Sequence, residues 1–260
     1  MNHPTHASLS RRHFLSALGA TALLTCAPTR LWSSSAATHL RLAQLIYSDG
    51  NWQPRPTALR RLAWELHKRT AVPVELEPVS TTPTTAGLGR NPLLFMLGDR
   101  PFAPFPKAHL DRLRRYLRLG GTLIIDPAHT VDGDPTGFRA HAHNLAAELL
   151  PDAASTPIQA EHVIFRSFYR LTRPTGRIRG PETLTGWPLG DRMAIISTDH
   201  DLAGALARDN LGNWEFPVEP GGDRQRENAF RLGINLVMYA LCLDYKNEQP
   251  HLRFPQSPAP

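Results

Sequence analysis

Aspartate residues follow four segments of the chain that we expect to form strands. They are Asp49, Asp99, Asp126 and the stretch Asp199-His200-Asp201, with Arg100 and His129 close by in the sequence. Because the carboxyl ends of parallel strands meet at one edge of an open sheet, these side chains should converge there. Convergent carboxylates could bind a divalent cation through oxygen, bind sugar hydroxyl groups, or place a general acid beside a general base.

Asp126 and Asp199 are the candidates for a catalytic pair, since each follows an apolar strand that should end at the same edge. The alternative is structural, because aspartate commonly turns the chain after a strand and caps the next helix. A hydrolase needs two carboxylates, or a carboxylate and a histidine, in one cleft, whereas a scaffold would pair them with backbone amides or arginines. His162, which precedes an apolar stretch, is a further candidate acid or base, or a partner of a backbone carbonyl.

Several other residues are candidates for ligand binding rather than catalysis. Trp52 and Trp214 stand beside asparagines in expected loops, where exposed aromatic rings suit a sugar platform, although a loop tryptophan can also tuck against its own domain. The expected binding residues are Asp49, Trp52, Asp99, Arg100, His200 and Trp214. The residues identify no metal ligands, since His141 and His143 would point about 200° apart on a helix and cannot share one ion. The residues identify no cofactor.

The elements that must position these residues alternate between strand and helix. Strands are expected at residues 40–47, 72–76, 93–97, 122–125 and 192–197, and helices from residue 57, from residue 107 to the glycines at 120–121, from 138 to 149 and from 228 to 243. Residues 163–169 are expected to be extended and residues 78–92 to form a loop. Apolar strands that alternate with helices are typical of an α/β fold, a parallel sheet with helices on both faces. Cys242 should be a small core residue of the last helix.

The N-terminal 37 residues have the parts of an export signal. Arg11 and Arg12 precede a short apolar run at 18–24, and small residues end at Ala37, where we expect cleavage. The paired arginines resemble a twin-arginine signal, so the export partner would be that machinery and the location periplasmic or secreted. The apolar run is too short for a membrane anchor, while Cys26 leaves a lipoprotein as the alternative. We expect a signal at 1–37, one α/β domain at 38–246 and a disordered, proline-rich tail at 247–260.

The basic charge of the chain does not indicate nucleic-acid binding. The net charge is +6, from 29 basic and 23 acidic residues, and three of the arginines lie in the expected signal. The densest basic run, residues 112–118, should be the solvated face of a helix. Without the signal, Cys242 is the one cysteine left, so we expect no disulfide within the chain.

Several stretches together resemble a known bacterial family. They are FMLG (95–98), LRLGGTLIID (117–126), EHVIF (161–165) with Phe168-Tyr169, and FRLGIN (230–235) with Tyr239-Ala240-Leu241, after an opening segment at 40–52. This combination resembles the family of domain of unknown function 4159. The resemblance implies a flavodoxin-like sheet similar to class I glutamine amidotransferases, without an established activity. Those enzymes carry a nucleophilic cysteine on a turn after a strand, whereas the comparable turn here is Gly98-Asp99-Arg100.

Together these features predict an exported ligand-binding or accessory protein of the cell envelope, with a carbohydrate or another envelope component as its partner. The alternative is a hydrolase that uses the strand-end carboxylates on a carbohydrate or envelope substrate. We expect no stable membrane span.

Overall fold

Seven strands form one sheet in a computed structural model of the chain, which describes residues 39–130 and 133–247. The strands are β1 (Ala43–Leu45), β2 (Val79–Thr81), β3 (Leu93–Gly98), β4 (Thr122–Pro127), β5 (Thr156–Ile158), β6 (Leu184–Leu189) and β7 (Arg192–Ser197). Their order is β2-β1-β3-β4-β7-β6-β5. The strands from β2 to β7 in this order are parallel, while β6 pairs antiparallel with both β7 and β5. The expected signal and residues 248–260 of the expected C-terminal tail lie outside the described residues, while Asn247, the first residue of that tail, ends the last helix.

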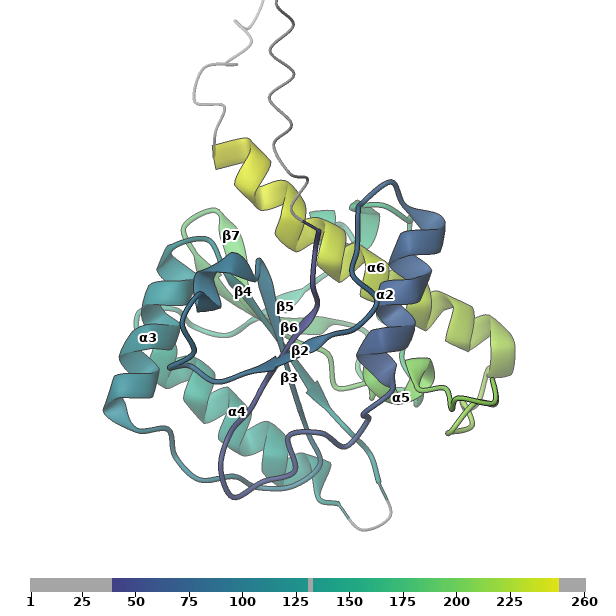
Figure 1. Ribbon diagram of the computed structural model, residues 1–260, viewed down its shortest axis with the longest axis horizontal. Coiled ribbons are helices and arrows are strands. Elements are labelled where there is room, and N and C mark those ends of the chain that lie inside the picture. Colours follow the sequence, from purple (N-terminus) through teal and green to yellow (C-terminus); the bar gives the residue numbers. More distant parts are fainter. Residues whose placement is uncertain (1–38, 131–132, 248–260) are drawn as a thin grey trace, which may run out of the picture. The chain divides into compact units, whose positions relative to one another are not determined.

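Helices cover both faces of the sheet (Figure 1). One face carries α2 (Ala58–Arg69), α5 (Leu202–Leu206) and α6 (Gly222–Asn247), and the other carries α3 (Lys107–Arg118) and α4 (Pro135–Leu149). Alternate side chains of β3 enter the two cores, Leu93, Phe95 and Leu97 on the α6 side and Leu94 and Met96 on the α4 side. This burial on both faces explains the unbroken apolar runs of the central strands. The expected α/β fold with a flavodoxin-like sheet is confirmed.

Some short elements differ from those expected. Residues 72–76 form no strand, because Pro73 has no backbone N–H and only Val74 makes an isolated parallel bridge, to Leu40. The edge strand is instead β2, inside the segment expected to be a loop, which also holds the 3₁₀ helix η1 (Leu88–Arg90). Residues 163–166, expected to be extended, form the 3₁₀ helix η2 (Val163–Arg166). In these short segments, local hydrogen bonds therefore determine the secondary structure, and hydrophobic periodicity does not predict it.

The prediction that Cys242 is buried is wrong. Its side chain is exposed near the C-terminal end of α6. The helix is apolar nearly all round as far as Ala240, whose side chain is buried, but its last turns run past the sheet (Figure 1). The hydrophobic pattern alone could not show at which residue the helix extends beyond the core.

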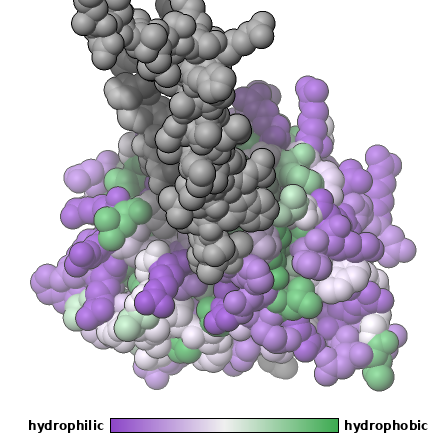
Figure 2. Space-filling model, turned by 45° about the horizontal axis from the view of Figure 1, so that its top comes forward, coloured by the Kyte–Doolittle hydropathy of each residue, from purple (hydrophilic) through white to green (hydrophobic). Residues whose placement is uncertain are grey.

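The outer face of α3 is charged. Arg112, Arg115 and Arg118 are exposed on α3, whose Leu113 and Leu117 are buried, as expected for a solvated helix face. The face in Figure 2 is mostly hydrophilic, with apolar residues in small groups. Within residues 39–130 and 133–247, no helix is long and apolar enough to cross a membrane.

Candidate functional site

The aspartates that follow the central strands lie at one edge of the sheet. The parallel register pairs Leu97 of β3 with Asp126 of β4, and Ile125 of β4 with Ser197 of β7. Asp99, Asp126 and the turn at 198–201 therefore follow one another across three neighbouring strands. We call this the carboxyl edge, and each of its four aspartates, Asp99, Asp126, Asp199 and Asp201, has a different environment.

Asp126 is a buried helix cap. Its carboxylate accepts hydrogen bonds from the hydroxyl of Thr198 and from the backbone N–H groups of Leu202, at 2.9 Å, and Ala203, at 2.7 Å. The two amides belong to the first turn of α5, whose free N–H groups need such acceptors. Burial, and then the charge of Asp201, raise the pKa of Asp126 to about 7, against the opposing effect of these hydrogen bonds. The residue is 1% exposed, so it lies out of reach of a ligand.

Asp201 is the centre of a buried ionic cluster. Its carboxylate lies 2.6 Å from Nη2 of Arg55 and also pairs with Nε of Arg177, while Oδ1 accepts from the backbone N–H of Gly204 at 3.0 Å. Both arginines also donate to the carbonyl oxygen of His129, at 2.9 and 2.6 Å. The cluster thus joins the loop before α2, the turn after β4, the loop before β6 and the start of α5. Its members position the carboxyl edge.

Asp99 is held by a second set of polar groups. Its carboxylate accepts from Nε of Arg100 at 2.8 Å, from Asn51 at 2.9 Å and from the hydroxyl of Thr130 at 3.4 Å. Burial opposes ionisation, but these hydrogen bonds together lower the pKa of Asp99. The carboxylate is therefore charged and fully occupied, and it fixes the loop that follows β1 against the end of β3.

Asp199 differs from its three neighbours, because its Oδ1 is buried without a hydrogen-bond partner among the described residues. Its Oδ2 lies 3.7 Å from Nη1 of Arg139, which is a long ion pair. Burial raises the pKa of Asp199, opposed by the charges of Arg139 and of nearby histidines. Burial likewise lowers the pKa of His129 and of His143, so both rings favour the neutral form. The backbone of Asp199 is left-handed, with φ of 56°, which few residues other than glycine, aspartate and asparagine adopt readily.

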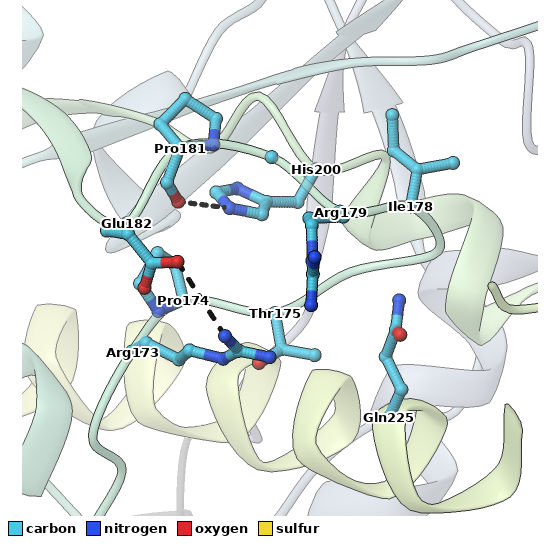
Figure 3. A pocket seen from close by; sticks show the side chains of 10 residues that line it. Arg173, Pro174, Thr175, Ile178, Arg179, Pro181, Glu182, His200 and Gln225 are labelled. Carbon is cyan, nitrogen blue, oxygen red and sulfur yellow. Dashed lines mark hydrogen bonds and ion pairs between the residues drawn. The ribbon is translucent and has the colours of Figure 1, made fainter. Parts of the chain in front are cut away.

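His200 anchors the loop before β6 to the carboxyl edge. The ring is 1% exposed, with Nδ1 3.0 Å from the carbonyl oxygen of Thr198 and Nε2 2.8 Å from that of Pro181. Figure 3 shows the bond to Pro181 at the margin of a small hollow. Both ring nitrogens are engaged by the backbone, so His200 holds the loop in place.

The remaining predicted binding residues are more scattered. Asp49 is exposed in the loop after β1, and Trp52 is half-buried there, with its carbonyl oxygen accepting from Gln44. The ring of Trp214 is stacked with Arg208 and Arg226, whose guanidinium carbons lie 4.9 and 4.2 Å from its centre.

His162 lies away from the carboxyl edge. Its Nδ1 accepts from the backbone N–H of Ile164 and caps η2, and its ring lies 5.8 Å from that of Tyr239. Tyr239 in turn accepts from the backbone N–H of Met193, at the start of β7, whereas Asp199 follows its end. A strand rises about 3.3 Å per residue, so the length of β7 separates His162 from Asp199.

Sequence reasoning missed Asp201 as the ionic centre, and with it Arg55 and Arg177. The Arg55–Asp201 pair joins residues 146 positions apart, and no local pattern marks such a contact. Arg55 stands between two prolines in a shaped loop, which is the one signal that could have drawn attention to it.

No group of three histidine, cysteine, aspartate or glutamate side chains in the described part of the chain could hold a metal ion. The comparison with protein families gives one match, to the model described as "Domain of unknown function (DUF4159)", over residues 41–241. No curated protein matches the chain.

Proposed function

Since this chain belongs to the DUF4159 family, whose description assigns no activity, we propose its function from the carboxyl edge: it is a ligand-binding or accessory protein of the cell envelope. One observation carries the proposal. The carboxylates of Asp99, Asp126 and Asp201 are all engaged by arginines, side-chain hydroxyls or amides, or backbone amides. Such pairing is typical of carboxylates with a structural role. It leaves few carboxylates at the carboxyl edge free to act as a general acid or base.

The ligand would bind around Asp199. The carboxylate of Asp199, which is 12% exposed and has a buried Oδ1 with no hydrogen-bond partner among the described residues, offers an acceptor. The guanidinium of Arg139 offers donors, and the neutral rings of His129 and His143 can each donate and accept. These groups include both donors and acceptors, and the charge of the carboxylate is balanced by one long ion pair. They suit a ligand rich in hydroxyl groups, each of which also donates and accepts. We therefore infer a carbohydrate ligand, as a glycan of the envelope would supply.

Hydrolysis has less support from the same geometry. The pKa of Asp126, about 7, suits a general acid, but the group is buried behind Thr198 and the start of α5. His162 lies near the other end of β7, which leaves Asp199, with a side chain 12% exposed, as the one partly exposed carboxylate among the predicted catalytic residues. Thiol chemistry of the amidotransferase kind is not proposed, since Asp99 stands at the comparable turn and is fully hydrogen-bonded.

The envelope location rests on the N-terminal residues. Arg11, Arg12 and the small residues up to Ala37 lie outside the described part of the chain, and they support export by the twin-arginine machinery to the periplasm or beyond. We propose no nucleic-acid partner, because the basic run on α3 is a solvated helix face.

The proposal is tested by titrating the full-length protein with peptidoglycan glycan strands, following heat unfolding and binding heat. We expect saturable stabilisation that Asp199→Asn weakens at least tenfold, since asparagine tolerates the left-handed backbone but removes the charge. Asp152→Asn, an exposed carboxylate in the turn after α4, is the matched control and should bind like the unaltered protein.

Two outcomes would count against this function. Equal binding by Asp199→Asn, or no response to the glycan strands, would remove the proposed site. Release of new reducing ends in the same mixtures, lost with Asp199→Asn, would establish the hydrolase instead.

A further inference from the structure

We propose that a second site, lined by arginines beside the first turn of α6, binds a ligand with a diphosphate or similar polyphosphate group. The cleft has a volume of about 420 Å³, within the range of small-molecule sites. Four arginines line it, Arg170, Arg173 and Arg179 from the loop before β6 and Arg224 from α6. This site is distinct from the one around Asp199 and does not depend on it.

The arginines of this cleft carry more positive charge than the protein compensates. Arg173 lies 3.7 Å from Glu182, whereas Arg170, Arg179 and Arg224 have no ion pair with any described residue. All four side chains are exposed, and none of the residues that line the cleft is acidic. Like charges held close together repel, so this arrangement favours binding of an anion that neutralises several of them at once.

The side chains that carry this charge face a common space. Figure 3 shows the neighbouring small hollow, which shares Arg173, Arg179, Thr175 and Gln225 with the cleft. In this view Arg179 points down from one part of the loop, Arg173 lies below it beside Glu182, and Gln225 rises from α6. Guanidinium groups that converge from separate segments can each take a different oxygen of one ligand.

The loop that carries three of the arginines is fixed to α6. The side-chain amide of Gln225 donates to the carbonyl oxygens of Gly176, at 2.9 Å, Arg177, at 3.2 Å, and Glu219, at 2.9 Å. Its Oε1 accepts from the backbone N–H of Gly221 at 2.9 Å. Beneath the loop, Arg177 is held by Asp201. A fixed frame reduces the entropy that the ligand must overcome on binding.

Phosphate fits this cleft better than a single carboxylate does. One carboxylate satisfies one arginine through two parallel hydrogen bonds, whereas a diphosphate offers more oxygens and more charge. The three guanidinium groups without an ion pair among the described residues can donate to these oxygens and neutralise this charge. A hydroxyl donor from Thr175 and an amide donor from Asn228 complete the lining.

The test is calorimetric titration of the full-length protein with inorganic pyrophosphate at constant ionic strength. We expect saturable one-to-one binding, weakened at least tenfold in the double variant Arg179→Gln, Arg224→Gln. The matched control is Arg112→Gln, Arg118→Gln, two exposed arginines on α3, which should bind pyrophosphate as the unaltered protein does. Asp199→Asn should also bind it normally, which separates this site from the proposed glycan site.

Three results would overturn the inference. One is the absence of saturable binding, and another is an equal loss in the cleft variant and the α3 control, which would indicate general attraction to a basic surface. The third is citrate binding as tightly as pyrophosphate, which would show that the cleft selects charge rather than phosphate.

Discussion

Two aspartates two positions apart have opposite roles at the carboxyl edge. Asp199 and Asp201 both have a left-handed backbone, with φ of 56° and 49°. Asp201 is buried against two arginines, whereas one oxygen of Asp199 has no hydrogen-bond partner among the described residues. Asparagine suits this backbone at either position, so the substitution removes the charge and one acceptor oxygen without straining the backbone.

Asp201→Asn should therefore lower the free energy of unfolding by about 3–5 kcal/mol, since it leaves Arg55 buried without its counter-charge. Asp199→Asn should leave stability unchanged or raise it, because burial already disfavours its ionised form. Urea unfolding of both variants at pH 7 measures the difference. Equal losses would mean that the ionic cluster does not organise the edge.

Asp126 should make stability depend on pH. Its pKa is about 7 in the folded protein, above the value of about 3.9 for an unfolded aspartate. Between these two pH values the folded chain holds a proton that the unfolded chain has lost. Stability therefore falls as pH rises from about 4 to about 7, by up to about 1.4 kcal/mol per pH unit, and this contribution is constant above pH 7.

The Asp126→Asn variant isolates that effect, because asparagine does not titrate while every other group remains. Its unfolding free energy, measured by urea at pH 5, 6, 7 and 8, should lack the part of the decline that Asp126 causes. Parallel pH profiles for the two proteins would show that the carboxyl is ionised throughout. At every pH the variant also loses one acceptor for the first turn of α5, which costs about 1–3 kcal/mol.

At the scale of elements, the sequence predicts long and fully buried segments best. β3 and β4 are runs of large apolar residues, and α3 has a clear leucine stripe, so burial alone determines them. β2 and β5 have three residues each, and β6 contains Pro188, so hydrophobic pattern carries little information there. These strands form because neighbouring strands offer them hydrogen bonds.

The candidate site shows the same division. That the aspartates share an edge follows from strand direction, which the sequence predicts. Which carboxylate is free does not, because it depends on Arg55 and Arg177, which arrive from distant loops. The path of a loop is set by contacts such as those of Gln225 with three carbonyl groups. Such contacts leave no periodic pattern in the sequence.

The loop before β6 depends on glycine where it touches the carboxyl edge. A Cβ on Gly176 would collide with the backbone carbonyl of His200, so Gly176→Ala should displace the loop and lower the unfolding free energy by about 1–3 kcal/mol. Gly89→Ala in η1 is the control, since a Cβ there meets nothing within 4 Å. Urea unfolding compares the two, and equal stabilities would show that the loop is not held closely at this point.

At the scale of the described domain, one loop connects the two proposed sites. Arg173 and Arg179 of this loop line the proposed pyrophosphate cleft beside α6. Between them, Arg177 pairs with Asp201, and the carbonyl oxygen of Pro181 contacts the ring of His200. Displacement of this loop should therefore disturb the cleft and the carboxyl edge together. Gly176→Ala is expected to weaken pyrophosphate binding as well as stability.

For the whole molecule, the envelope role requires that the chain leaves the cytoplasm, and this depends on Arg11 and Arg12. Changing both to lysine keeps the positive charge but removes the planar guanidinium groups. We expect the double variant to remain in the cytoplasm as the full-length precursor, while the unaltered protein is found outside it and begins at Thr38. Cell fractionation with N-terminal sequencing measures both. Arg30→Lys, the same change elsewhere in the segment, should be exported normally. Unimpaired export of the double variant would exclude the twin-arginine route, whereas retention of the unaltered protein in the cytoplasm would leave the envelope assignment without its basis.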